Sequence, residues 1–302
     1  MLKYRLVSGS FFILLLVVVV RYSQGWTNIF IPLVVAGISS IALLEFYYLM
    51  QRKGYTPLRT WGVGFSILYI YIIYFVSLYK VLQIEDLALM PIYFAILTAA
   101  MVITARQNIT TALSTLAATL AGFFYITWLL SFVMRIILWR GAEQMDGRYF
   151  CLFFIAVVKG TDIAAYFVGT WLGRHKLAPK ISPKKTIEGC IGGTLFAILL
   201  GSLLAVYMPS VKDSFRLMAG QLLPGSGTWF IMVLAGFVAF VLSVLGQFGD
   251  LAESIFKRDG NVKDSGGYIP GMGGVLDVID SLVFAAPMMY LLMKVMNWFE
   301  NL

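Results

Sequence analysis

Charged residues are scarce in this 302-residue sequence, at 13% of the chain against 60% hydrophobic residues. Soluble domains carry roughly a quarter charged residues, so the composition excludes an ordinary water-soluble domain. The sequence has two cysteines, Cys151 and Cys190, in apolar or glycine-rich stretches, which excludes a disulfide framework. A single histidine, His175, leaves no His/Cys cluster that would select zinc. The composition therefore indicates a protein that is embedded in a lipid bilayer.

Long apolar runs fill most of the chain. A membrane-spanning helix needs about 20 mainly apolar residues, and the pattern predicts an all-α fold, a polytopic transmembrane bundle of about nine helices. The first run follows Lys3 and Arg5, but no small-residue cleavage site comes after it, so we expect a helix and not a secretory signal. The predicted segments are residues 6–20, 28–50, 61–82, 87–104, 112–139, 149–172, 189–208, 228–250 and 275–298.

The net charge of +8 would suggest nucleic acid in a soluble protein, but here its distribution between loops matters more. Lys and Arg flank the predicted helices mainly on the side of the N-terminus. The positive-inside rule therefore predicts a cytoplasmic N-terminus. We expect the active site on the same side, and a bacterial inner or plasma membrane as the location. The basic connection from Arg135 to Arg148 lies on the opposite side, so one miscounted helix would invert the orientation.

Polar residues concentrate in the second half of the chain. We therefore expect residues 1–140 to be a scaffold of transmembrane helices and residues 141–302 to be the catalytic region. Glu45 is the exception, an acid within the second predicted helix. A charge inside a membrane is costly enough to suggest a function, although a packed structural acid is the simpler interpretation.

Two pairs of carboxylates flank one loop. Asp250 and Glu253 close one predicted helix, Asp277 and Asp280 open the next, and each pair has i, i+3 spacing. Because only residues 255–274 join the helices, both pairs lie at the same membrane boundary. Four acids in one place repel each other unless a cation lies between them, and hard oxygen ligands favour Mg²⁺, with room for a second cation.

The loop between these helices mixes cations with a further acid and glycine turns. Side chains of this kind bind phosphate oxygens, and glycine turns let backbone N–H groups face an anion. A positive-inside flank would explain any one of the cations, but not the whole set beside the acids. The candidates are Lys257, Arg258, Lys263, Asp264, Gly273 and Gly274.

A second polar cluster lies on the same predicted side. Lys159 and Asp162 share a helix at i, i+3 spacing and either neutralise each other or serve the site. Basic stretches beside a membrane commonly mean only topology and attraction to anionic lipid. Here hydrogen-bonding groups surround the cations, so a triphosphate or lipid phosphate would fit. The candidates in this stretch are Ser182, Lys184, Lys185, Thr186 and Glu188.

The loop and its flanks resemble the signature of phosphatidate cytidylyltransferases, also called CDP-diacylglycerol synthases. The resemblance rests on Ser254–Arg258, Lys263–Gly266, Pro270–Gly274 and Leu276–Asp280, with a further family element at Ser182–Gly189. It extends over residues 159–281. Met272 stands where many members have His, and Val278 stands where many have Arg.

This resemblance implies a nucleotidyltransferase that joins CTP to phosphatidic acid and releases pyrophosphate. It implies Mg²⁺ held by Asp250 and Asp277, with catalytic support from Lys257, Arg258, Lys263 and Asp264. The implied partners are CTP, phosphatidic acid and membrane lipid, without nucleic acid, and a homodimer is left open. The remaining candidates would bind substrate, and they are Asp162, Ser182, Lys184, Lys185, Thr186, Glu188, Gly273, Gly274 and Asp280.

Two alternatives stay open. A CTP-dependent lipid-alcohol kinase would use similar metal and phosphate ligands, but the alcohol would attack the γ-phosphorus. An ion or solute transporter would also use intramembrane acids, but it predicts broken helices in corresponding positions of two halves.

Overall fold

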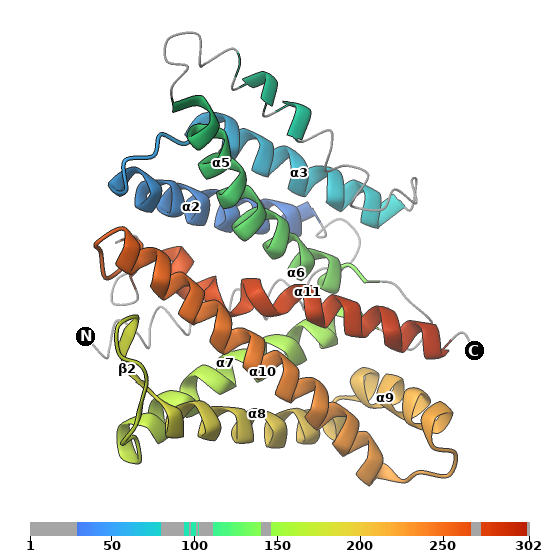
Figure 1. Cartoon of the computed structure of the whole chain (residues 1–302). Helices are drawn as coiled ribbons and strands as arrows, with labels where there is room; N and C mark the ends of the chain where they lie inside the picture. Colours follow the sequence, from blue (N-terminus) through green and yellow to red (C-terminus); the bar gives the residue numbers. More distant parts are fainter. Residues whose placement is uncertain are drawn as a thin grey trace. The chain divides into compact units, whose positions relative to one another are not determined.

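The structure is a computed structural model that describes residues 29–79, 94–96, 98–100, 102, 111–139, 146–266 and 273–300 (Figure 1). Within these residues, seven helices are long and apolar enough to cross a membrane, which confirms an all-α polytopic bundle. The predicted segment 6–20, most of segment 87–104 and the turn at 270–272 lie outside the described residues. The seven spans comprise α2 (Phe30–Arg52), α3 (Arg59–Tyr79), the continuous run of α5 (Ala112–Gly122), η4 (Phe123–Trp128) and α6 (Leu129–Ile137), then α7 (Gly147–Trp171), α8 (Ile187–Tyr207), α10 (Thr228–Asp259) and α11 (Val275–Glu300).

The chain forms two compact units. The first unit is Met1–Met134 with Phe256–Ile279, and the second unit is Arg135–Ile255 with Asp280–Leu302. Helices α10 and α11 each contribute to both units, so the segment that joins them belongs with the N-terminal helices. The division of the chain by role, into a scaffold and a catalytic region at residue 140, stays a prediction.

In the first unit, Tyr47 of α2 fills the space that two glycines leave. A Cβ at Gly122 or Gly62 would overlap the Tyr47 ring, and the Tyr47 hydroxyl donates to the Thr119 carbonyl at 3.0 Å. The neighbouring Phe46 packs edge-on against Phe256, with ring centroids 5.4 Å apart. This aromatic contact fixes the end of α10 onto α2, because aromatic pairs favour such geometry.

In the second unit, α7 and α8 pack side by side along their length (Figure 1). Small residues allow the close approach, since a Cβ at Gly193 would lie 2.8 Å from the Thr161 carbonyl oxygen. Asp146 caps the first turn of α7 by accepting a hydrogen bond from the Arg148 backbone N–H at 3.0 Å. Thr186 does the same for α8, with its hydroxyl accepting from Gly189 N–H at 3.1 Å.

Two elements were not predicted. An antiparallel hairpin of β1 (Lys176–Ala178) and β2 (Ser182–Thr186) lies between α7 and α8, with Lys176 opposite Thr186. The short helix α9 (Pro209–Leu222) lies between α8 and α10 and buries Val211, Phe215 and Ala219. Both are too short and too polar to show a spanning pattern.

Helix α10 corrects a predicted boundary. The sequence ended this helix near residue 250, but it continues to Asp259, so Asp250 and Glu253 lie inside the helix. The apolar side chains of Leu251, Ala252 and Ile255 keep the helical pattern going past the acids. The helix stops where Asn261 adopts a positive φ of 55° and the Gly260 N–H reaches the Phe256 carbonyl.

Candidate functional site

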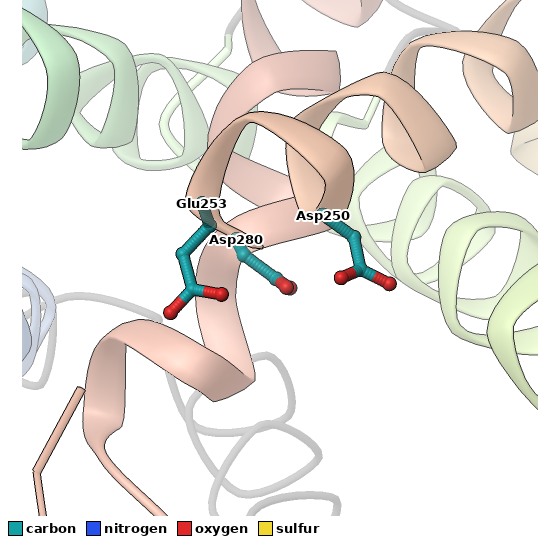
Figure 2. Close-up of side chains that lie close together, drawn as sticks. All are labelled: Asp250, Glu253 and Asp280. Carbon is teal, nitrogen blue, oxygen red and sulfur yellow. The ribbon is translucent and has the colours of Figure 1, made fainter. Parts of the chain in front are cut away.

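Three carboxylates gather in the second unit. Asp250 and Glu253 come from α10 and Asp280 comes from α11. One carboxylate oxygen from each of the three lies within 4.8 Å of those of the other two. Figure 2 shows the three side chains extending toward the same side of the two helices. Glu253 and Asp280 are buried, and Asp250 is partly exposed. The i, i+3 spacing of Asp250 and Glu253 therefore does place both acids on one face, as predicted.

Glycine makes this approach of the two helices feasible. A Cβ at Gly249 would lie 2.6 Å from the Asp280 carbonyl oxygen and 2.7 Å from the Cβ of Phe284. Because both distances are shorter than real Cβ contacts, any larger residue at position 249 would force α10 away from α11. The glycine next to Asp250 thus brings Asp280 close to it.

The cluster has the chemistry of a cation site. Three carboxylates at such distances repel each other strongly in a medium of low dielectric constant. A bound cation relieves that repulsion, and an all-oxygen set suits a hard divalent ion such as Mg²⁺. The donor set therefore fits a divalent cation, and the predicted acids Asp250 and Asp280 are part of it.

Lysine side chains surround the cluster within the second unit. Lys185 Nζ lies 2.5 Å from Asp250 Oδ2. Lys159 Nζ lies 3.2 Å from Asp162 Oδ2 and donates to the Ser281 hydroxyl oxygen at 2.8 Å, and this hydroxyl reaches Asp162 Oδ2 at 2.9 Å. Lys159 and Asp162 therefore form an ion pair. This pair belongs to a hydrogen-bonded network that includes Ser281, the residue after Asp280.

The hairpin separates its two adjacent lysines. Lys184 is exposed, whereas Lys185 is half-buried against Asp250. Ser182 begins β2 and Thr186 ends it as the cap of α8. Glu188 accepts hydrogen bonds from the backbone N–H groups of Arg174 and His175 and lies 2.6 Å from His175 Nδ1.

Asp277 belongs to the first unit and has its own set of partners. Its Oδ1 lies 2.5 Å from Lys257 Nζ. Its Oδ2 accepts from the Ser265 backbone N–H at 3.1 Å, the Ser265 hydroxyl at 2.9 Å and the Gly274 N–H at 2.7 Å. Gly273 has a φ of +92°, and a Cβ there would lie 2.5 Å from Asp277 Oδ2. The two predicted glycines thus allow the backbone to wrap the carboxylate.

The other predicted loop residues are exposed. Arg258 follows Lys257 on the last turn of α10, and Lys263 and Asp264 lie in the loop after it. Asp259 pairs with Lys53 at 2.8 Å, which raises the pKa of Lys53 through its hydrogen bond to Asp259. Arg258 and Lys263 are therefore accessible to a solvent-borne ligand, whereas the Lys257 side chain is only 14% exposed.

Several residues were underrated in the sequence. Glu253 was noted for its spacing but not placed among the site residues, and Ser265 and Ser281 were not singled out as partners. His175 was given no role, yet it contacts Glu188. Glu45 did have a signal in the sequence, because it is an acid inside an apolar helix. In the structure it is 3% exposed and accepts backbone hydrogen bonds.

The chain is similar to one protein family and to relatives that share one name. The model of the Cytidylyltransferase family matches residues 3–296. A "Phosphatidate cytidylyltransferase" of Brucella suis is 43% identical over 171 residues, which are 57% of this chain and 55% of the relative. Proteins of the same name from Staphylococcus haemolyticus and Bacillus subtilis are each 39% identical, over 152 and 158 residues. These cover 50% and 52% of this chain and 52% of each relative, so each match spans about half the length of the relative.

Proposed function

Because the chain belongs to the Cytidylyltransferase family, we propose that it transfers the cytidylyl group of CTP to phosphatidic acid and releases pyrophosphate. The product is CDP-diacylglycerol. The proposal rests on the names of the relatives and on one structural observation above all. That observation is the cluster of Asp250, Glu253 and Asp280, with Lys185 in contact with Asp250.

We propose that Asp250 and Asp280 hold a divalent cation, with Glu253 beside them. A ligand role for Asp277 stays a prediction of the family resemblance alone, since its carboxylate contacts Lys257, Ser265 and the Gly274 N–H within the first unit. The ion proposed is Mg²⁺, which when bound would offset the negative charge of the triphosphate. The carboxylates themselves would fix the position of the cation within the protein.

The reaction itself needs no nucleophile from the protein. An oxygen of the phosphatidate phosphate forms a bond to the α-phosphorus of CTP. The bond from that phosphorus to the oxygen bridging to the β-phosphorus breaks, and the electron pair leaves with pyrophosphate. The protein's contribution is to position the two anionic substrates, CTP and phosphatidate, and to offset the charge on the leaving group. Enzymes generally catalyse phosphoryl transfer in this way.

Lysine and arginine side chains are proposed to bind the phosphates. Lys185 lies next to the acid cluster, and Lys257 lies next to Asp277, so each is in contact with a proposed ligand. Arg258 on the last turn of α10 and Lys263 in the loop after it are exposed and suit phosphate oxygens. Lys184, Ser182 and the exposed side of the hairpin are proposed to contact the remaining substrate groups.

We further propose that the N-terminus and this site face the cytoplasm of a bacterial inner or plasma membrane. The support is the excess of Lys and Arg on that side of the predicted helices. CTP is a cytoplasmic nucleotide, so the site must face the compartment that supplies it.

Product analysis tests the reaction. Purified protein in detergent micelles is incubated with Mg²⁺, phosphatidic acid and CTP labelled on the α-phosphorus. We expect the label in a CDP-lipid, with one pyrophosphate formed for each. A lipid-alcohol kinase would instead leave the label in free CDP and phosphorylate an added alcohol, and a transporter would leave CTP intact. Either of those results would contradict the proposal.

A further inference from the structure

Glu188, in the first turn of α8, joins the two ends of the β1–β2 hairpin. Its carboxylate accepts hydrogen bonds from the backbone N–H groups of Arg174 at 3.1 Å and His175 at 3.2 Å, just before β1. The Nδ1 atom of His175 lies 2.6 Å from Glu188 Oε1. An ionised carboxylate only accepts hydrogen bonds, so the imidazole donates from Nδ1. Three donors from the start of the hairpin thus bind one side chain that follows its end.

Backbone contacts close the same end of the hairpin. The Ile187 N–H donates to the His175 carbonyl at 2.9 Å, and Lys176 lies opposite Thr186 in the two-stranded sheet. Thr186 is 6% exposed and packs against the end of α7, where a Cβ at Gly173 would lie 2.7 Å from Thr186 Cγ2. We call residues 174–176 and 186–188 the hairpin base. Its backbone is held by both strands and by the turn into α8.

Lys185 directly precedes the hairpin base on β2, and its Nζ lies 2.5 Å from Asp250 Oδ2. A lysine side chain loses much rotamer freedom when it is fixed in one contact. The contact with Asp250 is therefore favoured when the backbone that carries Lys185 is already held. Glu188, His175, Lys185 and Asp250 all belong to the second unit, so every contact in this chain of causes lies within one compact unit.

We propose that Glu188 is a positioning residue, which with His175 holds the hairpin base and so places Lys185 against Asp250. This role differs from the substrate contact predicted for Glu188, because its carboxylate already accepts bonds from Arg174 and His175. The consequence for catalysis rests on the proposed function, in which Lys185 binds a phosphate beside the acid cluster. The placement of Lys185 does not, since it is a property of the protein without substrate.

Three substitutions separate this role from packing. Glu188→Ala removes the acceptor, and His175→Phe keeps a ring of similar shape but removes the Nδ1 donor. His175→Asn is the conservative variant, because its amide nitrogen is as many bonds from Cα as Nδ1 is and also donates. The matched control is Thr170→Ala at the same end of α7, where the exposed Thr170 hydroxyl donates to the Phe167 carbonyl at 2.9 Å.

Competitive acetylation of the lysines tests the placement without any turnover. Purified protein in detergent is treated with trace acetic anhydride, and mass spectrometry gives the labelling ratio of Lys185 to its exposed neighbour Lys184. Lys185 must leave Asp250 to react, so Glu188→Ala and His175→Phe should raise this ratio by about 3- to 5-fold, the scale of a partly exposed ion pair. His175→Asn should recover most of the protection, and Thr170→Ala should leave the ratio unchanged.

A double-mutant cycle tests the route to catalysis through Lys185. We expect His175→Phe to lower kcat/KM for CTP in the unsubstituted protein. The same substitution should have little effect in a Lys185→Ala background, because the side chain that it positions is already gone. A purely structural defect would lower kcat/KM by the same factor in both backgrounds.

An unchanged labelling ratio in Glu188→Ala and His175→Phe would overturn the proposal, as would an equal rise in Thr170→Ala. If Glu188→Ala does not fold, His175→Phe carries the test, since the His175 side chain is 75% exposed. The two levels of failure are distinct. Unsubstituted protein that forms no CDP-lipid sinks the proposed function, and the labelling ratio then still decides whether Glu188 and His175 hold Lys185 in place.

Discussion

Lys185 Nζ lies 2.5 Å from Asp250 Oδ2, so a lysine of the β1–β2 hairpin balances one acid of the carboxylate cluster. The pair is partly buried, with side chains 26% and 31% exposed. A cation bound to Asp250 would compete with the lysine for the same oxygen, and the freed ammonium would then be available to a phosphate. The contact therefore links the metal and phosphate parts of the proposed site.

Lys185→Ala should lower kcat/KM for CTP by about 100-fold, the scale seen when one charge-stabilising donor is removed from an active site. The physical reason is the loss of a positive charge beside the proposed cation and phosphates. Steady-state kinetics of CDP-lipid formation at several CTP concentrations would measure it.

The matched control is Lys180→Ala, which removes an exposed lysine from the turn of the same hairpin. It should stay within about 2-fold of the unsubstituted protein, since exposed charges contribute little. Equal losses in both variants would mean that the hairpin acts only through its total charge.

Gly249→Ala should destabilise the protein by about 1–3 kcal/mol, as expected for overpacking, and abolish most activity. The added methyl group would press on the Asp280 carbonyl and on Phe284 and move α11 away from Asp250. Thermal unfolding in detergent and CDP-lipid formation would report the two effects.

Gly37→Ala is the comparison for that variant, because nothing lies within 4 Å of a Cβ at Gly37. Alanine is the better helix former, so this variant should be neutral or slightly more stable. If Gly249→Ala behaved like Gly37→Ala, the close packing of α10 on α11 would be wrong.

The sequence predicted the spanning helices well because a bilayer imposes a simple rule. Each span must be mainly apolar along its length, and α3 and α8 follow that rule directly, with charged residues only in their first turns. The end of α10 did not follow it, because Asp250 and Glu253 resemble a polar helix end although the helical pattern continues to Asp259. The two acids thus hid the true end of the helix.

The site was predictable in its residue types but not in its pairing. The i, i+3 spacing predicted that Asp250 and Glu253 share one face of their helix, because helix geometry alone sets that relationship. The contact of Lys185 with Asp250, and of Ser265 with both Glu45 and Asp277, joins residues far apart in sequence. Such contacts depend on how the helices pack, and a single sequence has no periodic signal for that.

Asp146→Ala should cost about 1 kcal/mol of stability, the usual effect of losing a helix N-cap. Asp146 caps α7 and also pairs with the Arg148 guanidinium at 2.6 Å. Partial burial favours its neutral form, but the hydrogen bonds and charge of Arg148 outweigh burial and hold the pKa of Asp146 below its usual value.

The lowered pKa fixes the direction of the pH dependence. A carboxyl whose pKa is lower in the folded state stabilises it above the unfolded pKa, about 3.9 for Asp, and loses that contribution as pH falls further. The difference in melting temperature between Asp146→Ala and the unsubstituted protein should therefore be larger at pH 7 than at pH 3. Asp146→Asn keeps the cap but not the charge, so its deficit should be smaller at pH 7. A deficit of Asp146→Ala independent of pH would contradict the role of the charge.

A cysteine at position 180 should report the orientation in the membrane. Lys180 is exposed in the hairpin turn, whereas the native Cys151 is buried and Cys190 is half-buried. In Lys180→Cys, a membrane-impermeant maleimide should label inside-out vesicles and not intact spheroplasts. The protein without this substitution gives the background. Labelling in spheroplasts alone would invert the proposed topology.

Divalent-cation dependence of CDP-lipid formation in Asp250→Asn and Asp280→Asn, with Asp277→Asn beside them, tests the central claim most directly. A suitable control is Asp213→Asn, an acid of α9 that lies outside the carboxylate cluster. The account predicts that turnover requires Mg²⁺, that the three variants lose at least about 100-fold of it, and that Asp213→Asn keeps it. Near-normal, Mg²⁺-dependent turnover in Asp250→Asn or Asp280→Asn would contradict the account.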